Sequence, residues 1–231
     1  MKICGLNKTT LLDYPGKVAA TVFLDGCNYR CPFCHNGPLV LSPGSEPAIP
    51  PEEFTTFLKK RQNILQGICV TGGEPTLHKE LPALLEHIRS FGYAIKLDTN
   101  GSRPEVLQRL HKEGLIDMVA MDIKSSKENY SKVCGIRYPD LSAIEASVEY
   151  LMASGIGYEF RTTVVKELHS RDDFISIGKW IAGAKAYFLQ AYKSAPGVIT
   201  PGFSSFTAEE LAQFQQLLLT TIPLVEIRGI D

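Results

Sequence analysis

The sequence predicts an α/β fold, specifically a partial (β/α)6 barrel with parallel strands. Short apolar runs rich in β-branched residues alternate with longer segments of helical period. Runs that are apolar on both faces are typical of parallel strands covered by helices. Polar residues follow the ends of successive runs, and the carboxyl ends of barrel strands meet on one face. An open doubly wound sheet is the alternative.

Six runs are expected to form the strands of the barrel. They cover residues 18–24, 68–71, 94–98, 118–122, 158–165 and 186–191. Apolar residues at helical spacing predict helices around residues 81–91, 106–110, 144–152 and 211–218. Two segments rich in Pro and Gly, residues 41–51 and 194–205, are expected to be loops rather than domain linkers.

Length and composition indicate one globular protein. The 231 residues suffice for a single domain over residues 1–231, with a core of about 17–193 and a C-terminal extension over 194–231. A net charge of −1 argues against a nucleic-acid or polybasic membrane surface. Neither a signal peptide nor a run of roughly 20 apolar residues is found, so we expect a cytoplasmic protein without membrane contact.

Three of the six cysteines, Cys27, Cys31 and Cys34, lie within eight residues. Disulfides rarely persist in the cytoplasm, so this clustering points to metal or redox chemistry. Thiolates are soft donors suited to iron–sulfur clusters or zinc. Three thiolates on a cubane cluster would leave one iron available to a substrate. Cys69, inside an apolar run, is interpreted as a small buried hydrophobe.

Other metal interpretations explain the cysteines less completely. A structural zinc site normally has four ligands, and His35 could complete one only with awkward geometry. The segment from Cys31 to His35 matches the haem-attachment pattern C-x-x-C-H, and its first four residues match a thioredoxin-like redox pair. Both patterns leave Cys27 unexplained. We favour an iron–sulfur cluster over zinc, and zinc over haem.

Four motifs together resemble a known family. They are Cys27-x-x-x-Cys31-x-x-Cys34 with Phe33 before the last cysteine, Gly72-Gly73-Glu74-Pro75, Asp98-Thr99-Asn100-Gly101 and Asp122-Ile123-Lys124. This set resembles the radical S-adenosylmethionine enzymes. Residues 5–17 and the run Cys34-His35-Asn36 resemble the branch that activates glycyl-radical enzymes, in particular activators of anaerobic ribonucleoside-triphosphate reductase.

The resemblance implies two cofactors and assigns residues to them. Cys27, Cys31 and Cys34 would hold a [4Fe–4S] cluster. The expected contacts to S-adenosylmethionine involve residues at successive strand ends: Phe33, Gly72, Gly73, Glu74, Asp98, Lys124, Arg161 and Gln190. Within this set, the Glu74 carboxylate suits the cofactor's ammonium group and the Lys124 ammonium suits its carboxylate.

Some of these residues have plain structural interpretations as well. Asp98 and Lys124 could form an ion pair, and Arg161 could belong to a buried salt bridge. Phe33 could pack the loop or stack on adenine, while His35 and Asn36 would orient the loop. A monovalent-cation site found in some activators has oxygen ligands of the kind that three residues here could supply, namely Asp98, Thr99 and Asp122. The resemblance therefore also implies a candidate cation site at these residues.

The implied reaction needs no acid–base dyad. Reductive cleavage of S-adenosylmethionine would give a 5′-deoxyadenosyl radical that generates a glycyl radical on a partner enzyme, here anaerobic ribonucleotide reductase, with a flavodoxin-like electron donor. The alternatives are an activator of another glycyl-radical enzyme such as the formate-lyase type, a radical enzyme acting on a small molecule, and a zinc-binding interaction module.

Overall fold

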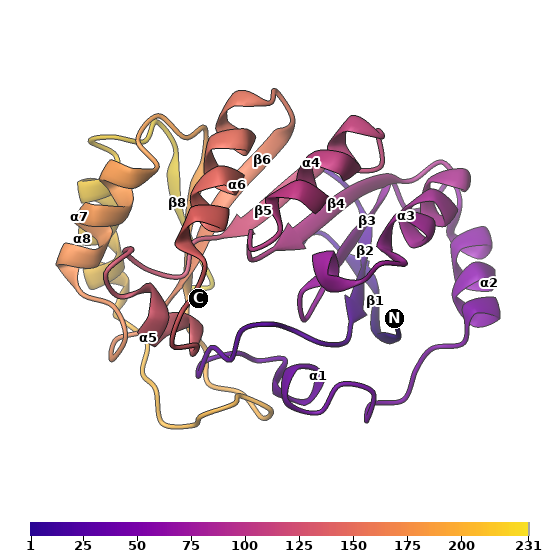
Figure 1. The fold of residues 1–231 in the computed structure, drawn as a ribbon, viewed down its shortest axis with the longest axis horizontal. Helices are drawn as coiled ribbons and strands as arrows, with labels where there is room; N and C mark the ends of the chain where they lie inside the picture. The colour runs from indigo at the N-terminus through magenta and orange to yellow at the C-terminus, as the bar shows by residue number, and fades with distance from the viewer. Residues whose placement is uncertain (231) are drawn as a thin grey trace. The chain divides into compact units, whose positions relative to one another are not determined.

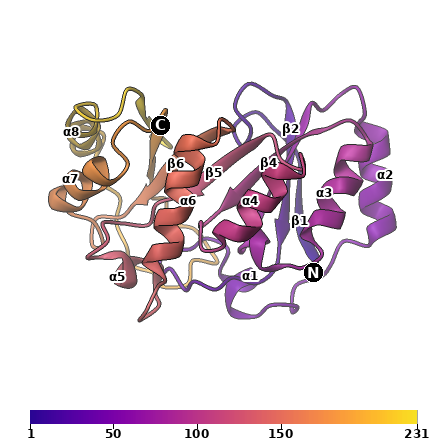
Figure 2. The ribbon, with the colours of Figure 1, turned by 45° about the horizontal axis from the view of Figure 1, so that its top comes forward.

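The computed structural model describes residues 1–230, and Figures 1 and 2 show its ribbon. Over these residues the strands form one sheet in chain order. The strands are β1 (Ile3–Thr10), β2 (Ala19–Leu24), β3 (Gly67–Gly72), β4 (Ala94–Thr99), β5 (Met118–Asp122), β6 (Gly157–Val164), β7 (Tyr187–Ala191) and β8 (Val225–Arg228). The helices are α1 (Gly37–Leu41), α2 (Pro51–Arg61), α3 (Leu81–Ser90), α4 (Pro104–Lys112), α5 (Tyr130–Cys134), α6 (Leu141–Ala153), α7 (Arg171–Trp180) and α8 (Ala208–Leu218), with a short 3₁₀ helix η1 (Pro75–Leu77).

The chain divides into two compact units. The first comprises Met1–Asn28, Pro38–Thr99 and Arg103–Ala120. The second comprises Tyr29–Gly37, Asn100–Ser102 and the chain from Met121 onward. The single domain expected from the sequence stays a prediction.

In the first unit, β2, β3 and β4 pair in parallel and β1 pairs antiparallel with β2. The strands expected at 18–24, 68–71 and 94–98 are confirmed, because near-continuous apolar runs satisfy both faces of a covered parallel sheet. The edge strand β1 was not expected, since its polar residues are largely exposed. Helix α2 was also not expected, because only Phe54 and Leu58 are buried.

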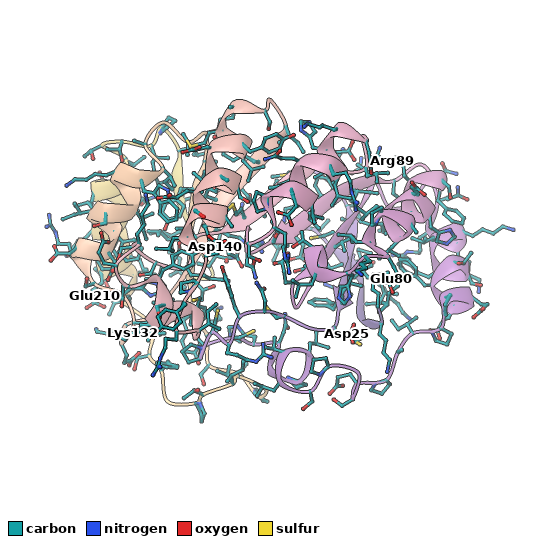
Figure 3. All side chains as sticks on the ribbon, viewed as in Figure 1. Asp25, Glu80, Arg89, Lys132, Asp140 and Glu210 are labelled. Carbon is teal, nitrogen blue, oxygen red and sulfur yellow. The ribbon has the colours of Figure 1, made fainter. Side chains whose placement is uncertain are left out.

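In the second unit, β6, β7 and β8 pair in parallel. Side-chain caps define where the helices begin: the Asp140 carboxylate accepts from the Ala143 N–H at the start of α6. Capping boxes pair Ser170 with Asp173 at α7 and Thr207 with Glu210 at α8. Figure 3 labels Asp140 and Glu210. The short strand β8 and helix α7 have few apolar residues in phase, so the periodicity did not indicate them.

The other strands and helices predicted from the sequence are present as well. The strands expected at 118–122, 158–165 and 186–191 are present, as are all four predicted helices. Residues 194–205 form neither helix nor strand, as predicted for a loop. The loop predicted at 41–51 covers residues 42–50, because Leu41 ends α1 and Pro51 begins α2. Among the described residues, no helix is both long and apolar enough to cross a membrane.

Candidate functional site

The backbone before Cys27 is held by the turn that follows β3. Gly73 N–H donates to the Leu24 carbonyl at 2.8 Å, and Glu74 N–H donates to the Gly26 carbonyl at 2.7 Å. A Cβ atom on Gly73 would lie 1.8 Å from the Gly26 oxygen, and Gly72 has φ +122°. Only glycine allows this approach. The two glycines therefore fix the start of the cysteine loop, a role that the sequence analysis did not assign to them.

Glu74 is 1% exposed, and its Oε1 atom is the acceptor of a hydrogen-bond network. This oxygen accepts from the Thr76 N–H at 3.1 Å, the Thr76 hydroxyl at 2.5 Å and the Thr99 hydroxyl at 2.7 Å. The network caps η1 and fixes the carboxylate in one orientation. Glu74 is thus an oriented anion at the end of β3.

Asp98 forms a buried ion pair that the sequence analysis missed. The Lys96 ammonium donates to Asp98 Oδ1 at 2.6 Å, and the Cys69 thiol contacts the same oxygen at 3.4 Å. Residues two apart on a strand share one face, so the alternation of Lys96 and Asp98 with Ile95 and Leu97 was the available signal. Cys69 is buried as predicted, and its thiol also contacts a carboxylate.

The second part of the cysteine loop is held by the carboxyl end of α5. Arg30 N–H donates to the Cys134 carbonyl at 2.9 Å, and the Cys31 thiol lies 3.7 Å from the same oxygen. Gly135 caps α5 with φ +70°, and a Cβ atom there would lie 2.0 Å from the Arg30 oxygen. Cys134, which had no assigned role, contacts the loop through its backbone.

Residues 193–200 hydrogen-bond the same loop from another segment. Ile199 N–H donates to the Cys34 carbonyl at 3.2 Å, and Thr200 N–H donates to the Pro32 carbonyl at 2.8 Å. The His35 ring donates through Nε2 to the Lys193 carbonyl at 2.5 Å, which agrees with the predicted orienting role of His35. This part of the C-terminal segment therefore positions the cysteine loop.

Asp122, at the end of β5, forms ion pairs with two cationic side chains. The Lys124 ammonium lies 2.8 Å from one carboxylate oxygen, and Arg161 Nε lies 2.6 Å from the other. Burial alone would raise the pKa of Asp122, but the charges of Arg161 and Lys124 outweigh it and hold this pKa well below its usual value. The salt bridge weighed for Arg161 is present, and its partner is Asp122.

A buried polar network supports the backbone at Lys124. His169 Nε2 donates to the Lys124 carbonyl at 2.9 Å, while its Nδ1 accepts from the Val165 N–H at 3.1 Å. Asp173 accepts from the hydroxyls of Ser125 and Ser126 just after Lys124. These bonds connect the segment after β5 to the loop after β6 and to the first turn of α7, and no sequence motif indicated His169 or Asp173.

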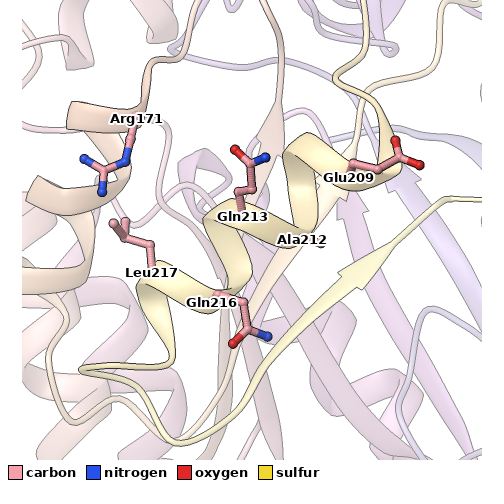
Figure 4. A pocket seen from close by; sticks show the side chains of 6 residues that line it. All are labelled: Arg171, Glu209, Ala212, Gln213, Gln216 and Leu217. Carbon is pink, nitrogen blue, oxygen red and sulfur yellow. The ribbon is translucent and has the colours of Figure 1, made fainter.

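One surface hollow in the second unit lies away from the predicted site residues. It has a volume of about 700 Å³ and lies on the surface of α8 near the start of α7. Figure 4 shows its lining residues: Arg171, Glu209, Ala212, Gln213, Gln216 and Leu217. None of the predicted site residues lines it, so this hollow is not the predicted cofactor site.

A family model described as the Radical SAM superfamily matches residues 21–180, which is more than half of the chain. The chain belongs to the radical S-adenosylmethionine superfamily. It is accordingly a radical S-adenosylmethionine enzyme, and the cysteine motif and strand-end motifs described above lie within the matched residues.

Two relatives of this radical S-adenosylmethionine enzyme are activating enzymes. A putative glycyl-radical enzyme activating enzyme of Methanocaldococcus jannaschii is 30% identical over 195 residues, covering 83% of this chain and 80% of that protein. The pyruvate formate-lyase-activating enzyme of Streptococcus mutans is 29% identical over 200 residues, covering 80% of this chain and 74% of that protein.

A solved structure confirms the predicted fold class. The crystal structure of a domain of pyruvate-formate lyase-activating enzyme from Bacteroides vulgatus matches with a TM-score of 0.58 and 19% sequence identity. The match covers 71% of this chain and 99% of that domain. The fold is therefore the α/β fold of the radical S-adenosylmethionine enzymes.

Membership of this superfamily implies a [4Fe–4S] cluster and S-adenosylmethionine, and the chemistry of the residues fits both. Cys31 and Cys34 are joined by a tight turn with a 3.0 Å hydrogen bond from Cys34 N–H to the Cys31 carbonyl. Burial, together with the Asp122 charge, raises the pKa of the Cys34 thiol, and the Asn36 N–H and the Lys124 charge offset only part of this rise. Lys124 therefore favours the thiolate form that binds iron.

Several predicted cofactor contacts stay predictions, and the structure gives the position of their side chains. Phe33 is buried, and Gln190 is half-buried near the end of β7, in register with Thr163 and Arg228. Thr99 donates its hydroxyl to Glu74. Across the residues that the structure describes, no three His, Cys, Asp or Glu side chains are already arranged around a metal position. Cluster ligation by Cys27, Cys31 and Cys34 stays a prediction.

Proposed function

We propose that this radical S-adenosylmethionine enzyme activates a partner by generating a glycyl radical, with anaerobic ribonucleoside-triphosphate reductase as the partner. The observation that carries the proposal is the three-cysteine loop, which lies within the residues that match the Radical SAM superfamily model. The chain is also similar to two activating enzymes. The sequence of residues 5–17 and of Cys34-His35-Asn36 supports this choice of partner.

In this proposal the chain's own residues hold and orient the cofactors. A [4Fe–4S] cluster with bound S-adenosylmethionine would supply the low-potential electron and the 5′-deoxyadenosyl group that abstracts hydrogen. Cys27, Cys31 and Cys34 provide the sulfur ligands. The tight turn and the backbone bonds from Cys134, Ile199 and Thr200 keep the loop in position.

Charged residues at strand ends match the charges of the amino-acid part of S-adenosylmethionine. Glu74 offers an oriented carboxylate to the ammonium group, and Lys124 offers its ammonium to the carboxylate. Gly72 and Gly73 present backbone beside Glu74, and Asp98 completes the set of anions. Arg161 acts through Asp122, because their 2.6 Å contact fixes the carboxylate that also pairs with Lys124.

The remaining roles concern the adenosine part and electron supply. Phe33 would stack on adenine and Gln190 would hydrogen-bond the ribose. No side chain has to act as a general acid or base, since the reaction moves an electron and a hydrogen atom. A flavodoxin-like protein is the expected electron donor.

Radical transfer to the partner tests this function directly. The anaerobically reconstituted and reduced protein is mixed with S-adenosylmethionine and anaerobic ribonucleotide reductase, and electron paramagnetic resonance detects a glycyl radical. We expect the radical with the wild-type partner and none when the partner's radical-bearing glycine is replaced by alanine. Formation of 5′-deoxyadenosine without a radical on this partner, but with one on a formate-lyase-type enzyme, would assign a different client.

A further inference from the structure

Lys96 is a basic side chain at the centre of a buried strand. It is 1% exposed and lies in β4 between Ile95 and Leu97, which are fully buried. Lysine is rarely buried to this extent without a partner, because removing an ammonium from water is costly. Its partner is Asp98, at 2.6 Å and on the same face of the strand. Both charges are therefore retained in the interior as a pair.

The pair involves a carboxylate that was among the expected ligands of a monovalent cation. The Lys96 ammonium and the Cys69 thiol both donate hydrogen bonds to Asp98 Oδ1. The positive charge of Lys96 therefore balances the negative charge of Asp98. The Thr99 hydroxyl donates its proton to Glu74 Oε1 at 2.7 Å. Two of the three expected cation ligands thus already have protein partners within the first unit.

The third expected ligand is balanced in the same way, within the second unit. Asp122 is bonded to Lys124 on one oxygen and to Arg161 on the other. Each of the two carboxylates therefore has at least one protein cation within 2.8 Å. A carboxylate whose charge is matched by an ammonium attracts an inorganic cation far less strongly than an unpaired one.

We propose that Lys96 is a built-in replacement for a monovalent cation at Asp98, so that this chain binds S-adenosylmethionine without potassium or sodium. The ammonium is a compact charge with three hydrogen-bond donors, and it orients the Asp98 carboxylate as a coordinated cation would. Lys96 is in this sense a positioning residue. The statement about S-adenosylmethionine rests on the proposed function, whereas the statement about cation binding does not.

The first test measures cation binding by the cofactor-free protein. Thallium(I), which substitutes for potassium and is detected by thallium NMR, should show no saturable binding to the wild type. Lys96→Met removes the ammonium and leaves Asp98 to recruit a cation, so saturable binding should appear. The double variant Lys96→Met/Asp98→Asn removes both charges and should again show none. Saturable binding by the wild type that Asp98→Asn abolishes would overturn the proposal.

Thermal unfolding of the same three proteins covers the case in which Lys96→Met is unstable. Its melting temperature should rise when potassium chloride replaces tetramethylammonium chloride, because potassium compensates the buried Asp98 charge. The wild type and the double variant should respond equally to the two salts. A Lys96→Met protein that melts alike in both salts, or fails to fold even in potassium while the double variant folds, would contradict the proposal.

The second test uses the cluster-loaded protein and equilibrium binding of S-adenosylmethionine. Exchanging potassium for tetramethylammonium should change the wild-type dissociation constant less than about twofold, and should weaken binding by Lys96→Met about tenfold. A wild type that requires potassium would overturn the proposal. Failure of the wild type to bind in any salt would instead contradict the proposed function, and the thallium result would still decide the role of Lys96.

Discussion

Glu74 shows how one carboxylate serves both the local fold and the proposed cofactor contact. Three hydrogen-bond donors from Thr76 and Thr99 converge on its Oε1 atom, which caps η1 and holds the side chain at the end of β3. The sequence motif identified the residue and the charge. The threonine contacts that orient the charge come from β4 and η1, so neither could be predicted from the motif alone.

Replacing Glu74 by glutamine separates charge from shape. The amide oxygen can still accept from the threonines, so the variant should fold, whereas its neutral side chain should bind S-adenosylmethionine about tenfold more weakly or worse. Equilibrium binding to the cluster-loaded protein measures this loss. Glu80→Gln, on an exposed carboxylate labelled in Figure 3, is the matched control and should bind normally. Equal affinity of the Glu74 and Glu80 variants would rule out the ammonium contact.

His169 makes stability depend on pH. Burial lowers the pKa of this imidazole, although the backbone oxygens of Lys124 and Val165 and the Asp173 charge oppose the shift. The unfolded chain, with a histidine pKa of about 6.5, therefore binds the proton more readily than the folded chain. The histidine's contribution to stability is complete above about pH 6.5 and is lost as the pH falls toward the folded-state pKa.

Thermal unfolding of the cofactor-free protein tests this dependence between about pH 7.5 and pH 5. The wild-type melting temperature should fall across this range, because protonation of Nδ1 removes the acceptor for the Val165 N–H. His169→Gln should show a smaller fall, since no imidazole remains to be protonated. If the two proteins lose stability in parallel, His169 is not the group responsible.

At the scale of elements, two segments far apart in the sequence position the cysteine loop. The end of α5 supplies the Cys134 carbonyl to Arg30, and residues 193–200 supply N–H donors to Pro32 and Cys34. The sequence predicted that residues 194–205 form a loop and left its role open. Periodicity reports which face of an element is apolar, but it contains no information about hydrogen bonds between irregular segments.

Gly135→Ala tests the contact at the end of α5. The added methyl group would lie 2.0 Å from the Arg30 carbonyl, so the loop carrying Cys31 must shift and the anaerobically reconstituted variant should retain less iron and sulfide than wild type. Gly155→Ala is the matched control. It also places alanine at positive φ, at +80°, but its Cβ atom meets nothing within 4 Å.

Both variants should therefore lose about 1 kcal/mol of stability from the left-handed backbone. Only Gly135→Ala should lose cluster. Iron and sulfide assays together with thermal unfolding distinguish the two effects. Equal cluster content in the two variants would show that the approach of α5 to Arg30 does not position the loop.

For the whole molecule, the sequence predicted the fold class and its parallel strands because long apolar runs leave few alternatives. The strands and the helix that the sequence did not predict have few buried apolar residues. The edge strand β1 and the short strand β8 carry polar residues that a covered strand excludes, and α2 buries only Phe54 and Leu58. The two strands are stabilised by backbone pairing, β1 with β2 and β8 with β7, and an apolar pattern does not encode this pairing.

The candidate residues were predicted better than their partners. Motifs located Glu74, Asp98, Lys124 and Arg161 because each follows or lies within a recognisable strand. Lys96 was missed because it lies in the middle of β4, where a buried cation is unexpected. The Asp122 contact to Arg161 spans 39 residues, and only the folded chain reveals it.

Cluster analysis with S-adenosylmethionine cleavage tests the central claim most directly. Protein purified and reconstituted without oxygen should contain about four irons and four sulfides per chain, and on reduction it should convert S-adenosylmethionine to 5′-deoxyadenosine and methionine. The variant with Cys27, Cys31 and Cys34 all replaced by alanine should do neither. Zinc in place of iron and sulfide, or an intact cluster that leaves reduced samples free of 5′-deoxyadenosine, would contradict the account.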